Sequence, residues 1–375
     1  MSSPIRTHLC LVSEQVLPNL IPALDPALRP EKLILATSER YANNAALLQE
    51  ALQKEGIAVE QMPIPDPFDF ASLRECFHAL ALAEEGIVAN ITCGTKPMSV
   101  AAHDAFVRAD RPVFYINDAS LMWFHDAGRP PHNLANTLSL EQFLAVHGTD
   151  VTHIIREPLP SLRRKAAYAI FMCLTADGTL ASRLNRYAEE ESRQLDKEVS
   201  AHPPKDLKAV LDILAEHGIA RQQLGSKNMP RLADLQAIEF ARGGWLEEYV
   251  FALLQENRHA MGIQDLARNV KLRKPGEAVN LDNEFDVAVL RGNTLYVIEC
   301  KTGNYAGNNI NPKEIIYQLP QITRASGGLR ARGMLLSLHE IKEGMRERAR
   351  ENRLEIIAGK ELKEIASRLR EFVGA

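Results

Sequence analysis

The chain has 375 residues, more than one hydrophobic core usually holds, so two or three domains are expected. With 46% hydrophobic and 25% charged residues and a formal charge of -4, the composition is that of a globular protein and excludes a disordered or fibrous chain. No apolar run approaches the roughly 18 residues of a membrane span, and the first residues lack a signal-peptide pattern. A cytoplasmic protein with no membrane partner is therefore expected.

The five cysteines are an odd number and show no Cys-x-x-Cys spacing, which argues against a disulfide framework and a structural zinc site. Charge is distributed unevenly along the chain. Residues 1–150 hold 10 Lys and Arg against 18 Asp and Glu, whereas residues 241–375 hold 21 against 18. The C-terminal segment is thus mildly basic, as a polyanionic substrate would favour.

Residues 1–150 alternate short hydrophobic runs with amphipathic ones, a pattern typical of a parallel sheet with helices on both faces. Strands are expected at 8–12, 32–36, 57–61, 86–91 and 112–116, and helices after Val16 and at 41–55, 70–84 and 98–109. Ligands of such Rossmann-like domains bind outside the carboxyl ends of the strands, where the free N–H groups of helix N-termini attract anions.

Polar residues follow several of these strands. The fourth strand runs into Thr92-Cys93-Gly94-Thr95-Lys96, where glycine allows close backbone approach and a lysine at a helix start is unfavourable without an anion. An ordinary strand-to-helix turn is the alternative, and neither a dinucleotide fingerprint nor a complete P-loop occurs. The candidate ligand contacts are Ser13, Glu14, Gln15, Thr37, Ser38, Thr92, Gly94, Thr95, Lys96 and Met98.

Residues 151–240 form a connecting region that proline punctuates. Helices are expected at 162–174, 180–199 and 205–218. One interpretation is a winged-helix-like module that contacts nucleic acid. The other is a segment that couples the flanking domains and packs in a dimer, and the acidic run at 189–191 favours it because phosphates would be repelled.

A third segment, residues 241–375, begins with a helix in GGWLEEYVFALLQEN. At about 100° per residue, Glu247 lies at the border of its hydrophobic face and Glu248 lies on the opposite, solvent side. Glu247 is therefore the better candidate to reach a buried site. A solvated acidic residue that the helix dipole favours is the alternative.

The hairpin at 283–302, NEFDVAVLRGNTLYVIECKT, carries the most informative pattern. Alternate strand residues share a face, so Glu299 and Lys301 project together at the end of an apolar strand, and Asp286 lies before the turn at 291–293. Burying such groups is costly unless they are paired or bind a metal. The arrangement Asp-x12-Glu-x-Lys resembles the PD-(D/E)-x-K superfamily of restriction-endonuclease-like enzymes. A helix containing Lys313, Tyr317 and Gln318, and strands at 332–338 and 354–358, are expected after it.

Taken together, the Ser-Glu-Gln and Thr-Cys-Gly-Thr-Lys turns, the GGWLEEYV helix and the Glu-x-Lys hairpin resemble the CARF-nuclease effectors of type III CRISPR systems. The resemblance covers essentially the whole chain. It implies an α/β protein with a CARF domain at 1–150, a helical or winged-helix-like connector at 151–240 and a PD-(D/E)-x-K nuclease domain at 241–375. One departure is Cys93, where a second small residue such as glycine is expected and where a thiol would narrow the ligand pocket.

The resemblance further implies a metal-dependent endonuclease of antiviral defence that cyclic oligoadenylate, in particular cyclic tetra-adenylate, activates. The ring would bind across the two-fold axis of a homodimer. The substrate would be DNA, RNA or both, cleaved to 5′-phosphate and 3′-hydroxyl ends. Asp286, Glu299 and the Cys300 carbonyl would bind manganese or magnesium (Mn2+ or Mg2+), hard ions that prefer oxygen. Glu247 would add to this shell, and Lys301 would orient the attacking water or offset charge on phosphorus.

Two other functions fit the same residues. A ligand-sensing regulator would bind nucleic acid through the connector without cutting it, and Glu299 and Lys301 would then be structural. A constitutive repair-type nuclease would keep the active site but would need no activator. Changing Glu299 tests the first alternative, and changing Lys96 tests the second.

Overall fold

The computed structural model describes residues 5–126, 128–135, 137–194, 203–222, 229–273, 283–303 and 312–374. The chain divides into two compact units, of which the first ends at Asp150 and the second begins at Val151. The expected connector and nuclease segments thus belong to the same unit. None of the helices in these described ranges is long and apolar enough to cross a membrane.

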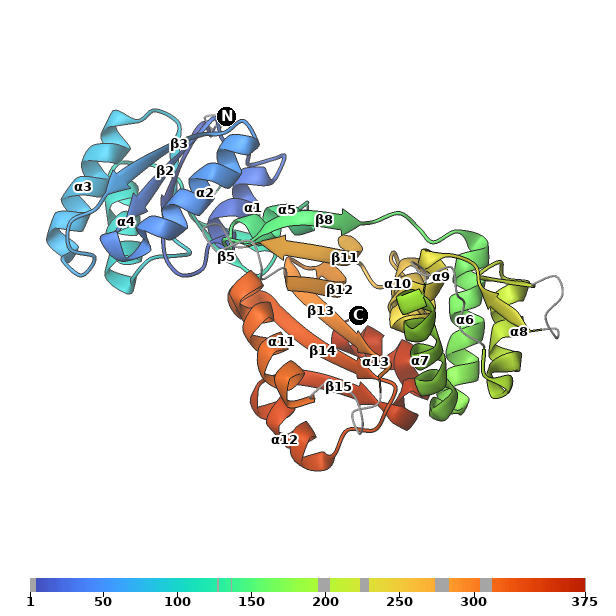
Figure 1. Ribbon diagram of the computed structural model, residues 1–375. Coiled ribbons are helices and arrows are strands. Elements are labelled where there is room, and N and C mark those ends of the chain that lie inside the picture. The colour runs from blue at the N-terminus through green and yellow to red at the C-terminus, as the bar shows by residue number, and fades with distance from the viewer. Residues whose placement is uncertain are drawn as a thin grey trace. The chain divides into compact units, whose positions relative to one another are not determined.

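The first unit is built on a seven-stranded sheet of order β3-β2-β1-β4-β5-β6-β7 (Figure 1). Its strands are β1 (Thr7–Leu11), β2 (Lys32–Thr37), β3 (Ala58–Pro63), β4 (Ile87–Asn90), β5 (Val113–Asn117), β6 (Ser120–His125) and β7 (His132–Asn133). The first five pair in parallel, as expected, and β6 and β7 add an antiparallel edge that the sequence pattern did not predict.

Helices cover this sheet and confirm the alternating pattern. They are α1 (Leu17–Leu24), α2 (Ala42–Lys54), α3 (Phe70–Ala83), α4 (Lys96–Arg108) and the short α5 (Leu140–Ala145). The side chains of Asp69 and Thr95 begin α3 and α4 by accepting hydrogen bonds from the first free N–H groups. Phe77 and Phe106 of these helices are fully buried against the sheet.

The second unit contains the connector helices and a small hairpin. The helices are α6 (Ser161–Ala176), α7 (Gly178–Gln194), α8 (Lys208–Glu216) and α9 (Leu235–Glu239), and the hairpin pairs β9 (Ala220–Gln222) with β10 (Pro230–Leu232). The three expected connector helices are therefore present. The first residues of the expected connector instead form a strand, β8 (Asp150–Ile155).

Strand β8 is the edge of a six-stranded sheet of order β15-β14-β13-β12-β11-β8 (Figure 1). The other strands are β11 (Asp265–Arg273), β12 (Asn283–Arg291), β13 (Thr294–Lys301), β14 (Ala331–Ser337) and β15 (Leu354–Ala358). Strands β11 to β13 are antiparallel, and β13 to β15 are parallel. Gly292 and Asn293 join β12 to β13 with positive φ angles of 56° and 54°, as a two-residue hairpin turn requires.

One hydrophobic core joins the connector to this sheet. The remaining helices are α10 (Trp245–Glu256), α11 (Pro312–Gly327), α12 (Glu343–Glu351) and α13 (Ile365–Phe372). Phe171 of α6 stacks on Tyr249 of α10 with ring centroids 3.7 Å apart, and both residues belong to a cluster that extends to Ile298 of β13. The connector is therefore part of the second unit's core and not a separate module.

His8 lies in the middle of β1 and is fully buried. Its ring packs edge-on against Phe114, and neither ring nitrogen finds a well-formed hydrogen bond among the described residues. Burial lowers the pKa of His8 to about 4, and the nearby Leu28 backbone offsets this effect only in part. The folded first unit therefore holds His8 neutral, whereas the unfolded chain protonates it below its ordinary pKa of 6.5.

A depressed pKa means that stability is present above pH 6.5 and is lost as the pH falls toward the folded value. When the pH falls from about 7.5 to about 5, the buried, neutral His8 is expected to lower the free energy of unfolding of the first unit by about 2 kcal/mol. His8→Leu should remove that part of the pH dependence. Urea unfolding followed by the fluorescence of Trp123, in a Trp245→Phe background, measures it, because these are the two tryptophans of the chain. Equal pH dependence with and without the substitution would contradict this account.

Candidate active site and ligand site

Asp286 and Glu299 lie at opposed positions of the β12–β13 hairpin. The ladder pairs Val287 with Ile298, and one further step of the same register brings position 286 across from 299. Opposed residues in an antiparallel pair share a face, with Cβ atoms about 5 Å apart. The Cys300 N–H donates a hydrogen bond of 2.7 Å to Asp286 Oδ2. The hairpin thus brings together the two carboxylates that the sequence pattern singled out.

Lys301 completes the pattern at the end of β13. Its Nζ lies 2.5 Å from Glu299 Oε1, and the two side chains are 26% and 17% exposed. Burial alone would lower the pKa of Lys301, but the carboxylates of Glu299 and Asp286 outweigh it and raise the pKa. Lys301 is therefore held as a cation. The side chain of Cys300, which lies between Glu299 and Lys301 in the sequence, packs into the core, as expected.

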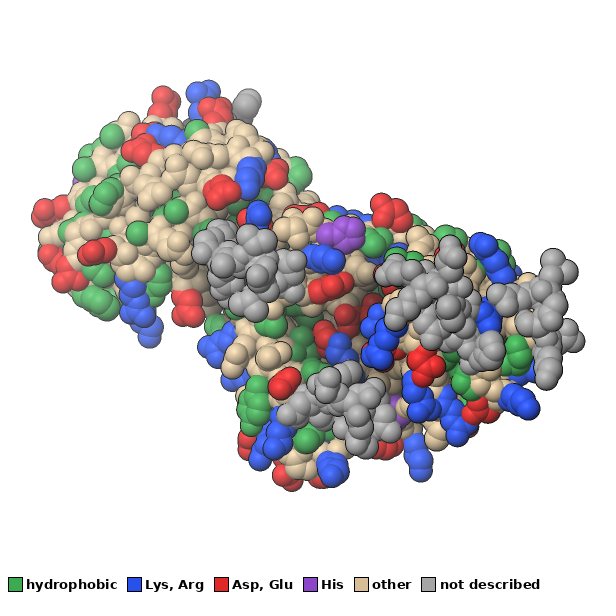
Figure 2. Space-filling model, viewed as in Figure 1, with side chains coloured by type: hydrophobic (Ala, Val, Ile, Leu, Met, Phe, Trp, Pro, Cys, Tyr) green, Lys and Arg blue, Asp and Glu red, His purple; other side chains and the backbone are tan. Residues whose placement is uncertain are grey.

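Glu247 joins these residues from the first turn of α10. Burial raises its pKa to about 7, an effect that Lys301 opposes and that Glu284 and Glu299 strengthen. Burial, Glu299 and Glu247 likewise raise the pKa of Asp286. Mutual effects of this kind require the carboxylates to lie close together. Acidic side chains accordingly gather beside basic ones over β12 and β13 (Figure 2).

Glu248 does not lie on the solvent side of α10, so that expectation is wrong. It is 8% exposed, and Arg163 of α6 donates from Nε and Nη2 to its two carboxylate oxygens at 2.7 and 2.9 Å. The Arg163 guanidinium also lies 4.3 Å from the centre of the Phe240 ring. Helix α6 covers the face that an isolated α10 would expose. Glu248 therefore fastens α6 to α10, and Glu247 is the glutamate next to the carboxylate pair.

The segments that carry Glu247 and Lys301 meet at a buried polar junction. Thr302 follows Lys301, is 5% exposed, and its Oγ1 lies 3.1 Å from the Asn185 amide of α7. Gly243 lies in the π-helical turn Phe240–Gly244 just before α10, with φ of 142°. A Cβ at Gly243 would lie 2.8 Å from Thr302 Oγ1. This junction was not predicted, because nothing in the sequence links α7 to the end of β13.

No group of three or more His, Cys, Asp and Glu side chains in the described ranges is arranged as a ready metal site. The chemistry of the donors nevertheless fits a hard divalent cation. Burial and neighbouring carboxylates raise the pKa of both Glu247 and Asp286, which shows negative charge that the protein does not fully compensate. A cation bound to these oxygens would relieve that repulsion.

The predicted ligand turns lie at the switch point of the first sheet. Strands β1 and β4 are neighbours, and the chain winds from β1 toward β3 on one side and from β4 toward β7 on the other. Ligands of doubly wound sheets bind at this point. Cys93 is buried and its Sγ donates to the Gln15 carbonyl at 3.3 Å, so the thiol joins the two turns. Gly94 has φ of 86°, and a Cβ there would lie 3.0 Å from Leu11 Cβ, so glycine is required.

Some of the predicted ligand contacts are engaged within the turns. Thr92 Oγ1 donates to Asn90 Oδ1 at 2.6 Å and accepts from the Ile116 N–H at 2.9 Å. Thr95 Oγ1 accepts from the Met98 N–H and donates to the Pro67 carbonyl at 2.7 Å. Thr37 and Met98 are buried, whereas the more accessible candidates are Ser13, Glu14, Gln15, Ser38, Gly94 and Lys96.

Asn90 is a residue of this site that the motif search missed. It is fully buried at the end of β4, and its Nδ2 donates to the Pro18 carbonyl at 2.8 Å and to Asn19 Oδ1 at 3.1 Å. Its Oδ1 also accepts from Thr92, so it fixes both turns at once. The available signal was an asparagine at the end of an otherwise apolar strand.

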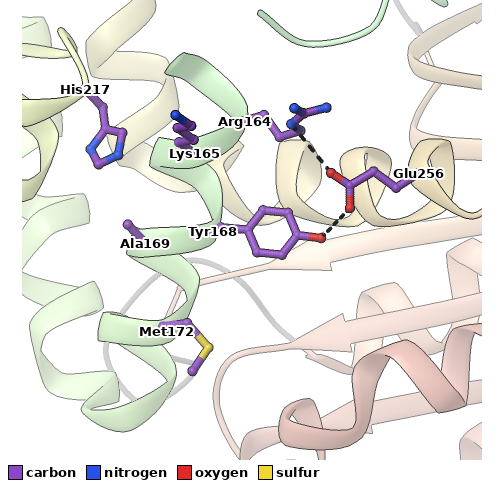
Figure 3. A pocket seen from close by; sticks show the side chains of 7 residues that line it. All are labelled: Arg164, Lys165, Tyr168, Ala169, Met172, His217 and Glu256. Atoms are coloured by element: carbon purple, nitrogen blue, oxygen red, sulfur yellow. Dashed lines mark hydrogen bonds and ion pairs between the residues drawn. The ribbon is translucent and has the colours of Figure 1, made fainter. Parts of the chain in front are cut away.

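A separate hollow of about 580 Å³ lies among α6, α8 and α10 (Figure 3). The Glu256 carboxylate contacts two of the lining residues: Tyr168 Oη lies 3.0 Å from Oε2, and Arg164 Nε lies 3.5 Å from Oε1. Burial and Glu256 raise the pKa of Tyr168 to about 12. The hollow is lined by Arg164, Lys165, Tyr168, Ala169, Met172, His217 and Glu256, none of which belongs to the predicted sites.

Comparison with known proteins identifies two domains in the chain. Residues 7–142 match the Card1 CARF domain, and residues 234–375 match the Card1-like endonuclease domain. The first match covers the sheet with the two ligand turns, and the second covers α10 and the carboxylate hairpin. A search of curated proteins finds no match.

Solved structures show the same fold. Protein VC1899 from Vibrio cholerae superposes with a TM-score of 0.83 at 21% identity over 98% of each chain. Can2 from Sulfobacillus thermosulfidooxidans in complex with cyclic tetra-adenylate has a TM-score of 0.79 at 22% identity, over 99% of this chain and all of that one. A type III CRISPR defence DNA nuclease activated by cyclic oligoadenylate has a TM-score of 0.57 at 17% identity, over 98% of this chain and 52% of that one. The chain thus carries a CARF domain of the Card1 type followed by an endonuclease domain of the Card1 type.

Proposed function

We propose that this chain is a metal-dependent endonuclease of type III CRISPR defence that cyclic tetra-adenylate activates through the CARF domain. The observation that carries the proposal is the cluster of Asp286, Glu299, Lys301 and Glu247 within the endonuclease domain. The fold shared with Can2, solved with cyclic tetra-adenylate, and with a DNA nuclease activated by cyclic oligoadenylate supports the activator.

Asp286, Glu299 and the Cys300 carbonyl are the proposed metal ligands, with Mn2+ or Mg2+ as the ion and Glu247 as an addition to the shell. A bound ion would polarise the scissile phosphate and make a bound water more acidic. The Cys300 N–H already orients Asp286 through its Oδ2, so the remaining lone pairs of the carboxylate can face an ion. DNA, RNA or both are the proposed substrates.

Lys301 would act on the phosphate itself. Neighbouring carboxylates raise its pKa, so the ammonium stays charged throughout the physiological range. A metal that takes over Glu299 would free the ammonium from its 2.5 Å ion pair, and Lys301 could then turn to the phosphate or to the attacking water. Its role is to offset the charge that develops on phosphorus.

The proposed activator site uses the exposed part of the β1–β4 switch point. Lys96 is exposed at the N-terminus of α4, where the positive end of the dipole of a 13-residue helix favours an anion. A cyclic oligoadenylate carries one negative charge per nucleotide and suits such a site. Ser13 and Gln15, on the neighbouring turn, are the proposed polar contacts.

A homodimer is proposed because the ligand is symmetric and the CARF domain exposes an apolar face. Val100 and Val107 are seven residues apart on α4, so they share a side of the helix, and they are 56% and 36% exposed. Phe124 on β6 is 52% exposed and lies edge-on to His103 of the same helix. Hydrophobic side chains also show at the surface over α3 and α4 (Figure 2). A second copy of this face is the proposed partner.

Removing a proposed metal ligand should abolish cleavage. Glu299→Ala is expected to lower the rate by more than about 100-fold with cyclic tetra-adenylate and Mn2+ present, because it removes both an ion ligand and the partner of Lys301. Gel assays on labelled single- and double-stranded DNA and RNA measure the effect. Glu343→Ala, at an exposed residue of α12, is the matched control and should cleave normally. Cleavage that survives Glu299→Ala would refute the site assignment.

Removing the cation of the CARF site should weaken activation. Lys96→Ala is expected to raise the cyclic tetra-adenylate concentration for half-maximal cleavage by about tenfold or more, since a charge-assisted phosphate contact is lost. The rate at saturating ligand should change little. Lys54→Ala, at an exposed lysine of the same domain, is the control. Full activity of the unchanged protein without any ligand would instead favour a constitutive nuclease.

Adding a methyl group at Gly243 should disturb the active site through Thr302. Gly243→Ala is expected to lower cleavage by about tenfold, because the start of α10 and the end of β13 must move apart. Gly218→Ala, at a position with φ of +75° and nothing within 4 Å, carries the milder strain of a left-handed backbone without a clash. It should cost about 1 kcal/mol of stability and leave cleavage unchanged. Equal activity of the two variants would show that the junction does not position Glu247 and Lys301.

A further inference from the structure

A left-handed backbone within a strand marks one more residue beside the carboxylates. The described residues other than glycine that have positive φ are Asp110, Asp118, Asp126, Asn269, Asn293 and Arg353. Five of these six lie in turns or just beyond a strand end, where the left-handed conformation reverses or redirects the chain. Asn269, with φ of 51°, lies instead in the interior of β11.

Position 269 of β11 lies opposite position 286 of β12, although the ladder itself does not include this pair. The β11–β12 ladder pairs Arg268 with Val287 and Val270 with Phe285, so the intervening positions 269 and 286 face each other. The register is the same on both sides of Asn269, which excludes the inserted residue of a β-bulge as the cause of its conformation. Asn269, Asp286 and Glu299 therefore form a row across three adjacent strands.

Nothing else in the described structure explains this conformation. Glycine is the residue that adopts it without strain, and an asparagine there costs free energy that the fold must supply. Asn269 is half-buried, and no hydrogen bond of its side chain to the described residues compensates for the strain. Strained residues of this kind are concentrated at functional sites.

The four described side chains that make up the carboxylate cluster include no neutral hydrogen-bond donor. Glu247, Asp286 and Glu299 all present oxygen acceptors, and Lys301 is paired with one of them. A phosphodiester also presents only acceptors. An amide N–H can donate to a phosphate oxygen without adding negative charge to the cluster.

We propose that Asn269 is a further catalytic residue, whose side-chain amide donates a hydrogen bond to a non-bridging oxygen of the scissile phosphate. This inference rests on the proposed endonuclease function. The amide transfers no proton, and it holds the phosphate next to Asp286 and Glu299.

Two substitutions test the side chain separately from the backbone. Asn269→Gly keeps the left-handed conformation without strain and removes only the amide, so kcat/KM should fall by about 10- to 100-fold while thermal stability is unchanged or higher. Asn269→Asp keeps the shape but replaces the donor with a charged acceptor, so its kcat/KM should fall further. Normal activity of Asn269→Gly would show that the residue acts only through its backbone conformation. Activity retained in Asn269→Asp would make its oxygen a metal ligand, and either result overturns the proposal.

Asn293→Gly is the matched control, because Asn293 has nearly the same φ of 54° but lies in the β12–β13 turn. It loses the 2.9 Å hydrogen bond that Asn293 Oδ1 accepts from Gln264 Nε2 but keeps the backbone N–H bond to Gln264 Oε1, so it should be less stable but fully active. A second measurement does not depend on cleavage: the anisotropy of labelled single-stranded DNA, with Ca2+ in place of Mn2+ and with cyclic tetra-adenylate. Asn269→Gly should raise the dissociation constant severalfold, and an unchanged constant would count against the phosphate contact.

The same assays distinguish failure of this inference from failure of the proposed function. Cleavage that survives Glu299→Ala contradicts the endonuclease site itself. An inactive Glu299→Ala together with a normal Asn269→Gly overturns only the role of Asn269.

Discussion

The buried carboxylates at one end of the second sheet are the constraint on which the site depends. Asp286 and Glu299 are brought face to face by hairpin register, and Glu247 is added from α10, so like charges are concentrated where burial makes them costly. Lys301 compensates only part of that charge. The surrounding structure keeps these groups together. The Cys300 N–H orients Asp286, and Arg163 binds Glu248 beside Glu247. Thr302 packs against Gly243, which joins the end of β13 to the start of α10. The protein thus maintains negative charge at this end of the sheet that its own lysine balances only in part.

Much of the fold could be predicted because its determinants are local. Five parallel strands, the helices between them and the β12–β13 hairpin follow from apolar periodicity and from turn residues such as Gly292 and Asn293. Strand β8 could not be predicted in the same way, since it is half-buried or exposed and its place in the sheet comes from pairing with the distant β11. Glu248 illustrates the same limit, because an isolated helix does not show that α6 will cover its polar side.

The same distinction between local and long-range determinants applies to the candidate sites. Asp286, Glu299 and Lys301 were predictable because strand alternation places Glu299 and Lys301 on one face and the short hairpin turn sets the register that brings Asp286 beside them. The turns predicted to contact the ligand follow neighbouring strands, as the alternating pattern indicates, but Thr92 and Thr95 are engaged in the bonds that shape the turn. Asn90, Asn185 and Asn269 carry no motif. Their importance comes from burial, long-range contact or backbone geometry, which only the folded chain displays.

The shared core of the connector and the endonuclease has an evolutionary consequence. Sensor and nuclease domains are often regarded as parts that recombination can exchange, and the end of the connector near residue 240 would be the natural place to join them by sequence. Phe171, Tyr249 and Ile298 belong to one hydrophobic cluster, so a crossover there would divide a single core between two parents. A crossover just before β8 leaves both cores whole. The segment that must be exchanged as one piece is therefore the whole second unit from β8 onward, in which the connector packs as an internal layer against the endonuclease domain.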